Sequence, residues 1–189
     1  MEKTHEQFFK LFPDEFDLGK DTFPWSIHSN RPFLTFLLEY AVYVRDQKGF
    51  NKCIPHLEQI IELNPNDNQG IRDLLATTYL ITNQPAKVLQ LSEKYPDDTL
   101  PELAMGKILA LYKLNRKDEA QRFYKKNAKY LKHLRSELLA TTHQPPPDLD
   151  SSVEGIIVGS PEEALLFWMS QHSAWDSTKG ALDWLESIS

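Results

Sequence analysis

The sequence predicts an all-α protein made of about three helical hairpins in series, followed by C-terminal helices. Apolar residues recur at intervals of three and four almost throughout the chain, as they do on one face of a helix. There are seven glycines in 189 residues and no sustained alternation of Val, Ile and Thr, which argues against a large sheet. With 41% hydrophobic residues, the chain can bury the core of one domain, or of one domain with an appendage.

The first hairpin is predicted over residues 31–65. Its first helix ends at Lys48 and Gly49. Its second helix ends before Pro65, because proline lacks the amide hydrogen that a helix interior needs. The apolar faces consist of Leu34, Leu37, Leu38, Ala41 and Val44 in the first helix and of Ile54, Leu57, Ile60 and Ile61 in the second.

The same pattern then restarts twice. A second hairpin extends from Ile71 to Pro96 with a break at TNQP, and a third begins at Pro101 and turns in the segment LNRKDEA. The apolar faces consist of Ile71, Leu74, Leu75, Thr78 and Tyr79, of Val88, Leu89 and Leu91, of Leu103, Ala104, Ile108, Leu111 and Tyr112, and of Ala120, Phe123 and Tyr124. The stops at Pro65 and Pro96 are 31 residues apart, so the hairpins form a repeat.

This repeat resembles the tetratricopeptide repeat (TPR), whose period is about 34 residues. The matching positions are Leu37, Tyr40, Ala41, Val44, Cys53, Leu57, Ile60 and Pro65 in the first hairpin and Ile108, Leu111, Ala120 and Tyr124 in the third. In the second hairpin Ala86 lies only ten residues before Pro96, so its second helix is short. The resemblance implies a TPR-like right-handed superhelix.

A narrower resemblance covers most of the chain. The stretches NRPFLTFL, IIELNPNDNQGIRDLL and GSPEEALLFWMSQHSAWDSTKGALDWL are similar to signatures of a family of uncharacterised bacterial tetratricopeptide proteins. That family shares its C-terminal pattern with suppressor of tumorigenicity 7 proteins. The pattern consists here of Gly159, Glu163, Ala164, Trp175, Gly180, Ala181, Leu182 and Leu185, and Phe167, Trp168 and Lys179 depart from it. The resemblance implies a fold and no reaction.

Four segments are expected along the chain. They are an acidic and aromatic lead-in over residues 1–30, TPR-like repeats over 31–140, a Pro-rich connector over 141–158 and a C-terminal helical cap over 159–189. Ser160 is expected to cap the next helix, with Pro161 at its first position and Glu163 three residues after the cap. The last helices are expected to cover the open end of the repeats or to fill their groove. Their apolar residues are Leu165, Leu166, Trp168, Met169, Trp175, Leu182, Trp184 and Leu185.

The lead-in carries aromatic residues close to the first hairpin. Phe23, Trp25 and Phe33 are expected to pack in the core rather than to form a peptide-binding wall. Ser29 or Asn30 is expected to cap the first helix of the hairpin, with Pro32 in its first turn. Arg31 could pair with a carboxylate of the neighbouring repeat.

Composition limits the location and the partners of the protein. No window approaches the roughly 18 consecutive apolar residues of a membrane-spanning helix, and the N-terminal sequence lacks the layout of a secretion signal. The single Cys53 excludes an internal disulfide and suits a reducing compartment. We therefore expect a cytoplasmic protein without membrane contact, and its net charge of −6 makes nucleic acid an unlikely partner.

Positive charge is concentrated in one predicted helix. The segment from Lys113 to Arg135 contains nine basic and two acidic residues and thus carries +7, which leaves −13 on the rest of the chain. On a helix that begins near Lys117, four cations lie along one face. These candidate partner-binding residues are Arg122, Lys125, Lys129 and Lys132. Two interpretations stay open: a solvated face of a terminal repeat, or a site that binds an acidic peptide through charge-assisted hydrogen bonds.

The stretch NPNDNQGIR, from Asn64 to Arg72, is predicted to link two helices. Asn66 or Asp67 is expected to cap the second of these helices through its side-chain oxygen. Gly70 is expected in the first turn, where it would allow a neighbouring helix to approach. The candidate partner-binding residues of this stretch are Asn68 and Arg72, with Gln69 beside them.

Catalytic and metal sites are not indicated by the sequence. The six histidines are scattered, with no pair at the i, i+4 spacing that binds zinc on a helix. Aspartates at positions 14, 17 and 21 do not follow the spacing of a calcium loop. Cys53 is expected in the core at a helix crossing rather than as a nucleophile. We expect no cofactor and no enzymatic activity.

The function expected from these patterns is a protein-interaction or scaffold module. Stacked hairpins expose a groove in which a peptide or protein partner can bind without a cofactor, and an acidic partner is one of the two interpretations of the basic helix. Two alternatives remain open. One is an enzyme or enzyme subunit with a pocket between the repeats and the C-terminal helices, and the other is a structural protein that self-associates as a homo-oligomer.

Overall fold

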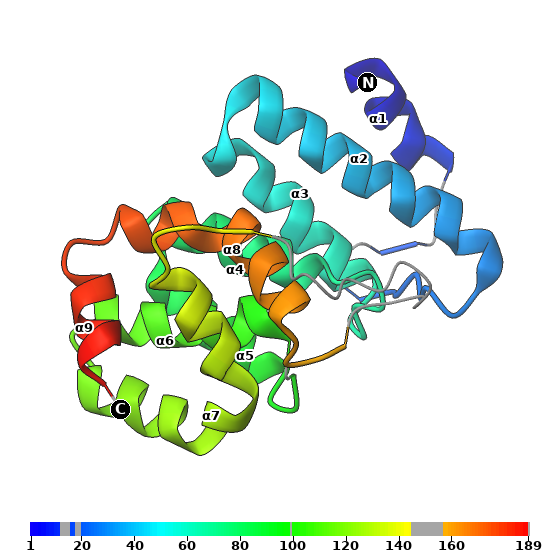
Figure 1. Cartoon of the computed structure of the whole chain (residues 1–189). Helices are drawn as coiled ribbons and strands as arrows, with labels where there is room; N and C mark the ends of the chain where they lie inside the picture. The colour runs from blue at the N-terminus through cyan, green and yellow to red at the C-terminus, as the bar shows by residue number, and fades with distance from the viewer. Residues whose placement is uncertain (12–15, 18–19, 99, 145–156, 189) are drawn as a thin grey trace. The chain divides into compact units, whose positions relative to one another are not determined.

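The computed structural model describes residues 1–11, 16–17, 20–98, 100–144 and 157–188. These residues form nine α-helices, α1 to α9, and no β-strand (Figure 1). The prediction of an all-α protein is confirmed. No helix within the described ranges is both long enough and apolar enough to cross a membrane. The chain divides into two compact units, Met1–Thr78 and Tyr79–Ser189, and the boundary lies inside α4 (Ile71–Ile81).

The N-terminal unit is built on a hairpin of α2 (Arg31–Lys48) and α3 (Phe50–Leu63), which pack against each other along their length (Figure 1). Gly49 alone separates the two helices, and its φ of +90° is a conformation that residues with a side chain rarely adopt. The predicted apolar faces meet in this hairpin, although Leu38 is only half-buried. The buried residues include Leu34, Leu37, Ala41 and Val44 of α2 and Cys53, Leu57, Ile60 and Ile61 of α3.

The predicted side-chain cap at the start of α2 is not formed. Asn30 precedes the helix, but its side chain makes no capping hydrogen bond and donates instead to the carbonyl of Pro24 at 3.0 Å. Pro32 lies in the first turn, as predicted. Arg31 donates from Nε to the carbonyl of Trp25 at 3.0 Å, and its guanidinium lies 5.3 Å from the centroid of the Trp25 ring. Arg31 therefore contacts the backbone oxygen and the aromatic face of Trp25.

The aromatic residues near α2 are not core residues, so this prediction is wrong. Phe33 is 38% exposed, and Phe23 and Trp25 are half-buried. Phe23 and Phe33 meet edge to face with centroids 5.9 Å apart. The physical reason lies in the helix geometry, since Phe33 is displaced by about 100° around the axis from Leu34, which faces the core.

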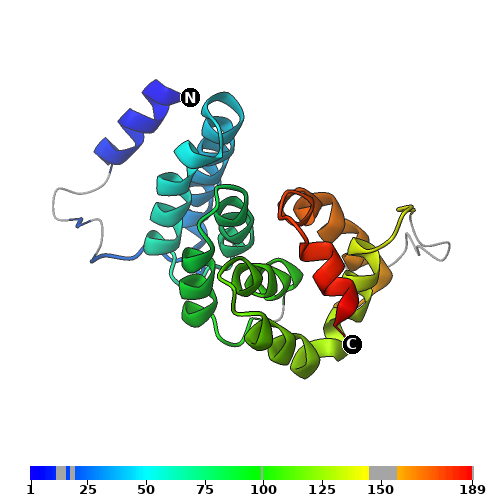
Figure 2. The same ribbon diagram turned by 90° about the vertical axis from the view of Figure 1, so that its left-hand side faces the viewer.

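The C-terminal unit is arranged around α6 (Pro101–Lys113). This helix packs against α5 (Pro85–Lys94), α7 (Lys117–Leu138) and α8 (Pro161–Asp176), and α8 also contacts α7 and α9 (Ala181–Ser187) (Figure 2). Because α6 is covered on several sides, its burial extends almost around the helix. Its buried residues are Pro101, Leu103, Ala104, Met105, Gly106, Ile108, Leu109, Ala110 and Leu111.

Two pairs of turns repeat along the chain. Asn83 follows α4 and Asn115 follows α6, with φ of +57° and +60°. In each turn the next amide donates to a carbonyl five residues back, from Gln84 to Tyr79 and from Arg116 to Leu111, which is the Schellman C-cap. A second pair of turns ends α3 and α5. Their C-caps Asn64 and Tyr95 have φ, ψ of −125°, 74° and −122°, 68°.

The C-terminal helices begin as predicted. Ser160 Oγ accepts a hydrogen bond from the amide of Glu163 at 3.1 Å, and the Glu163 carboxylate accepts one from the amide of Gly159 at 2.7 Å. Trp175 and Leu185 are fully buried. Of the apolar residues named for these helices, Leu166 and Met169 lie on the exposed side of α8 and are 47% and 61% exposed. Most of the predicted connector falls outside the described residues.

The C-terminal helices are joined to α6 and α7 by polar contacts as well. Arg135 of α7 donates to the carbonyls of Leu185 at 3.1 Å and of Glu186 at 2.8 Å. Tyr112 of α6 donates to the carbonyl of Lys179 at 3.1 Å, and its ring lies 5.1 Å from that of Trp184. The segment therefore packs against the outermost predicted hairpin.

Candidate functional site

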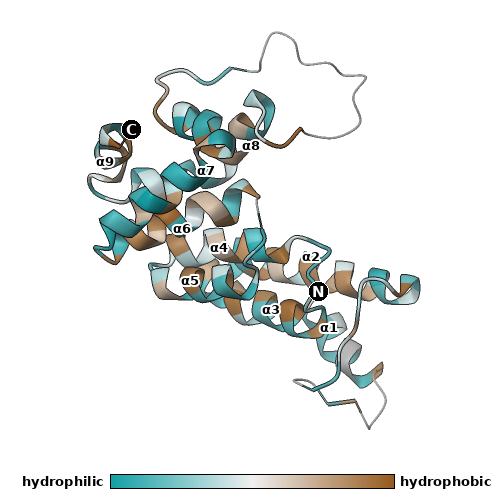
Figure 3. Ribbon diagram, turned by 90° about the horizontal axis from the view of Figure 1, so that it is seen from below, coloured by the Kyte–Doolittle hydropathy of each residue, from teal (hydrophilic) through white to brown (hydrophobic). Residues whose placement is uncertain are grey.

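Four basic side chains of α7 form an exposed strip. The buried face of this 22-residue helix consists of Ala120, Tyr124, Leu131, Leu134 and Leu138. On the opposite side lie four cations that are all exposed, and we call them the basic strip: Arg122, Lys125, Lys129 and Lys132. The hydrophilic side of α7 is visible in Figure 3. The structure thus brings together the four residues predicted for this helix.

The basic strip has no carboxylate within 4.0 Å in the part of the chain that the structure describes. The cations at the two ends of α7 behave differently. Arg116 forms two hydrogen bonds of 2.7 Å with the Glu119 carboxylate, and Arg135 is bonded to carbonyls of the C-terminal helices. The cations in the middle of α7 are therefore the ones that a partner protein could contact.

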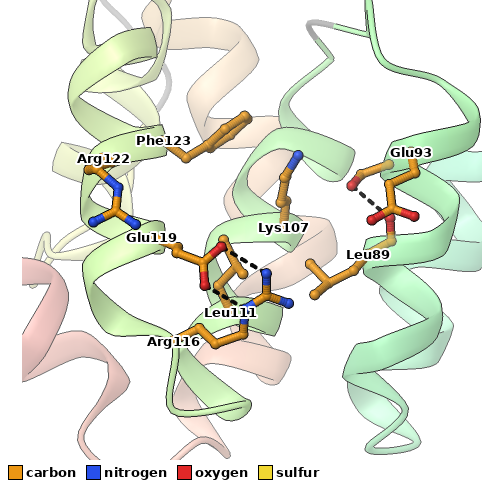
Figure 4. Close-up of a pocket in the computed structure, with 9 residues that line it drawn as sticks. Leu89, Glu93, Lys107, Leu111, Arg116, Glu119, Arg122 and Phe123 are labelled. Carbon is orange, nitrogen blue, oxygen red and sulfur yellow. Dashed lines mark hydrogen bonds and ion pairs between the residues drawn. The ribbon is translucent and has the colours of Figure 1, made fainter.

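A pocket of about 270 Å³ lies between α5, α6 and α7 (Figure 4). Its apolar lining comes from Leu89, Leu111 and Phe123. Ser92, three cations and two carboxylates complete the lining, and the charged residues are Lys107, Arg116, Arg122, Glu93 and Glu119. No residue of α8 or α9 lines it, so it is not the pocket expected for the enzyme alternative. Arg122 belongs to both the pocket and the basic strip.

The charges of the pocket are unequally compensated. The Arg116 guanidinium lowers the pKa of the Glu119 carboxyl, chiefly by hydrogen bonding, and the charge of Arg122 acts in the same direction. Lys107 has its Nζ 4.7 Å from the centroid of the Phe123 ring, a cation–π contact. Lys107 is a half-buried residue, and no described carboxylate lies within 4.0 Å of its ammonium.

The stretch from Asn64 to Arg72 serves a structural purpose in the N-terminal unit. Asp67 is 2% exposed and accepts hydrogen bonds from the amides of Ile71 and Arg72, each at 2.8 Å. It therefore caps α4, as predicted. Arg72 Nη1 lies 3.0 Å from Asp67 Oδ2 and 2.9 Å from its carbonyl oxygen. Asn68 is exposed.

Gly70 has a different role from the one predicted. It precedes α4 rather than lying in its first turn, and its φ is +74°. The nearest atom to a Cβ built there is Asp73 Oδ2 at 3.4 Å, so no neighbouring helix approaches closely. Glycine is favoured here by the backbone conformation, which residues with a side chain adopt less readily.

The remaining candidates for chemistry are accounted for by packing. Cys53 is 1% exposed, donates from Sγ to the carbonyl of Phe50 at 3.2 Å, and has its pKa raised by burial. Within the described ranges, no group of three or more His, Cys, Asp or Glu side chains is placed to hold a metal ion. The aspartate-rich stretch 13–21 lies partly outside those ranges.

Reasoning from the sequence missed Lys107 and one aromatic contact. Lys107 could have been found, because it is the single charged residue in the apolar run LAMGKILALY. The other is a contact of His5 with Tyr40, whose rings stack at 3.8 Å, with His56 edge-on at 5.2 Å from His5. No spacing rule joins these residues, since they come from three different helices.

Comparisons of the chain with protein-family models, with curated proteins and with solved structures find no match in any of the three.

Proposed function

We propose that the protein is a non-enzymatic, TPR-like interaction module that binds an acidic segment of a partner protein through the basic strip of α7. One observation carries this proposal: the four cations of the strip are exposed on one helix face, with no carboxylate within 4.0 Å of them in the described part of the chain. The buried single Cys53 suits a cytoplasmic protein.

The TPR-like part of the proposal is supported by the repeated turns. The C-caps Asn64 and Tyr95 are 31 residues apart, and the Schellman asparagines Asn83 and Asn115 are 32 residues apart. Repeats with a period of about 34 residues, each a pair of helices, stack into superhelices. We extend this local repetition to a right-handed superhelix of three hairpins as part of the proposal.

The acidic character of the partner follows from charge and spacing. Ammonium and guanidinium groups form their stronger hydrogen bonds with carboxylates. Arg122 and Lys132 are ten residues apart and therefore lie about 15 Å from each other along the helix. An extended segment at about 3.3 Å per residue covers this distance with about five residues. The partner therefore needs only a short run of Asp or Glu.

The first prediction tests the strip with a fluorescently labelled decaglutamate peptide in an anisotropy titration. We expect the combined change Lys125→Glu, Lys129→Glu and Lys132→Glu to weaken binding by about tenfold or more, because each change replaces an attraction by a repulsion. Circular dichroism should stay unchanged. Arg122 is kept, because it also lines the pocket.

A matched control makes the same change of net charge elsewhere. Lys52, Lys94 and Lys179 are exposed lysines outside the strip. Their replacement by Glu should weaken decaglutamate binding by about threefold at most, through long-range repulsion alone. An equal loss in both variants would show attraction to net charge and would refute the strip. Tighter binding of a DNA decamer through the same residues would favour nucleic acid instead.

A further inference from the structure

We infer that the pocket between α5, α6 and α7 holds an Asp or Glu side chain of the bound partner, with a neighbouring apolar side chain packed beside it. Lys107 supplies the ion pair, and Leu89, Leu111 and Phe123 supply the apolar contact. The inference rests on the proposed function and deepens it, since the pocket adjoins the basic strip at Arg122.

The size of the pocket suits one or two side chains. Pockets for cofactors and small substrates measure roughly 300–1,000 Å³. At about 270 Å³ this pocket lies just below that range, and three helices leave it open to solvent. It therefore fits an anchoring residue of a peptide better than a free cofactor.

The charge balance specifies a single carboxylate. Arg116 is already neutralised by Glu119, and the remaining lining charges are Lys107, Arg122 and Glu93. Their balance of one positive charge matches one carboxylate better than a phosphate dianion, which Glu93 would repel. Lys107 stands between α5 and α7 with its ammonium near the Phe123 ring, so an incoming carboxylate would meet a cation that lies against an aromatic ring (Figure 4).

The apolar lining adds the second requirement. In Figure 4, Phe123 extends from α7 and Leu89 from α5 toward the space between these helices, and Leu111 lies below Phe123 at about the level of Leu89. An apolar side chain next to the carboxylate would cover these surfaces and exclude water from the ion pair. A Leu–Glu pair therefore represents the sequence that the pocket should prefer.

The test uses two capped dipeptides, Ac-Leu-Glu-NH2 and Ac-Leu-Gln-NH2, titrated into the ¹⁵N-labelled full chain and followed by amide chemical shifts. We expect saturable shifts at Leu89, Lys107 and Phe123, and roughly fivefold tighter binding of the Glu peptide than of the Gln peptide. Lys107→Met keeps the stem and removes the charge, so it should abolish this preference.

Lys87→Met is the matched control. The Lys87 ammonium also lies over an aromatic ring, that of Tyr79 at 5.2 Å, but it does not line the pocket. This variant should keep the fivefold preference that the wild type shows for the Glu peptide. The inference would be overturned if the two dipeptides bound equally, if no amide shift saturated, or if saturable shifts occurred only at residues away from the pocket. A preference for the Glu peptide that survives in Lys107→Met would also overturn it.

The dipeptide titration tests the pocket independently of the decaglutamate titration, which tests the basic strip. A dipeptide in the pocket is too short to reach Lys125, Lys129 and Lys132, so the strip variant should still show saturable shifts at Leu89, Lys107 and Phe123 and should still prefer the Glu peptide. Loss of decaglutamate binding without a dipeptide preference would support the strip and refute the pocket. The reverse result would support the pocket and refute the strip.

Discussion

Asp67 shows how one side chain can join two helices. It follows the end of α3 in a left-handed conformation with φ of +47°, which Asp and Asn adopt more readily than most residues. Its two carboxylate oxygens accept hydrogen bonds from the first amides of α4 and from the Arg72 guanidinium. The carboxylate is thus buried without being left unpaired, and its removal would leave the first amides of α4 without their cap and would break the ion pair with Arg72.

The second prediction concerns this carboxylate. Asp67→Ala should lower the free energy of unfolding by about 2–3 kcal/mol, because the cap, the ion pair and a residue tolerant of positive φ are lost together. Asp67→Asn keeps the backbone preference and one acceptor and should cost about half as much. Asn66→Ala, at an exposed neighbour, should change stability by about 0.5 kcal/mol at most. Urea denaturation measures all three, and equal values for Asp67→Ala and Asn66→Ala would contradict the assigned role.

The third prediction is a pH dependence of the contact between α1 (Glu2–Phe8) and α2. His5 of α1 stacks on Tyr40 of α2, with His56 of α3 edge-on to both. Burial lowers the pKa of His5, the charge of His56 lowers it further, and Glu6 opposes this. Burial also lowers the pKa of His56, together with the charge of Lys48.

The lowered pKa values of His5 and His56 determine how stability changes with pH. The unfolded histidines bind protons more readily than the folded ones, so stability is complete above about pH 6.5 and falls as pH decreases through that value. Amide hydrogen exchange in α1, corrected for its intrinsic rate, should therefore be faster at pH 5.5 than at pH 7.5. His5→Phe keeps an aromatic ring and removes one titrating group, and it should reduce this difference. An undiminished difference in this variant would exclude His5 as its origin.

At the scale of elements, α6 and α7 differ in how completely they are covered. Three neighbours surround α6, and its residues 103–112 are correspondingly apolar except at Lys107. One long side of α7 remains open to solvent, and that side carries the basic strip. The C-terminal helices cover the other side, where Trp175 is fully buried.

The fourth prediction concerns this covering. Trp175→Ala should lower the free energy of unfolding by about 3–5 kcal/mol, because a large cavity forms between helices. Trp168 lies on the same helix but is half-buried, and its ring stacks with those of His143 and His172 at centroid distances of 3.6 Å and 4.7 Å. Trp168→Ala should cost at most about half as much, since less apolar surface is involved. Thermal unfolding measures both, and similar losses would show that α8 is not anchored mainly by Trp175.

At the scale of the whole molecule, charge is strongly separated along the sequence. The segment from Lys113 to Arg135 carries +7 and the rest of the chain −13. An acidic partner is repelled by most of the chain and attracted by one helix, so this separation favours a single binding orientation. Because exposed charges are screened by salt, decaglutamate binding should also weaken as the salt concentration rises.

Much of the fold could be predicted from the sequence. The helix limits follow from local chemistry, as at Pro65, the Ser160 cap and the apolar stripes of α2 and α3. The exposure of the basic strip could also be predicted, because its spacing places it opposite the buried face of the same helix. These properties depend on neighbours within a few turns of the same segment.

The tertiary structure decided the properties that depend on contacts between segments. Phe33, Leu166 and Met169 are as apolar as core residues, yet their positions on the helices leave them exposed. The Lys107 pocket requires three helices, and the His5–Tyr40–His56 contact requires three others. The sequence by itself thus determined the helices and the concentration of positive charge in α7. Which residues meet was decided by packing, because burial and electrostatic interaction depend on distances in space that sequence separation does not specify.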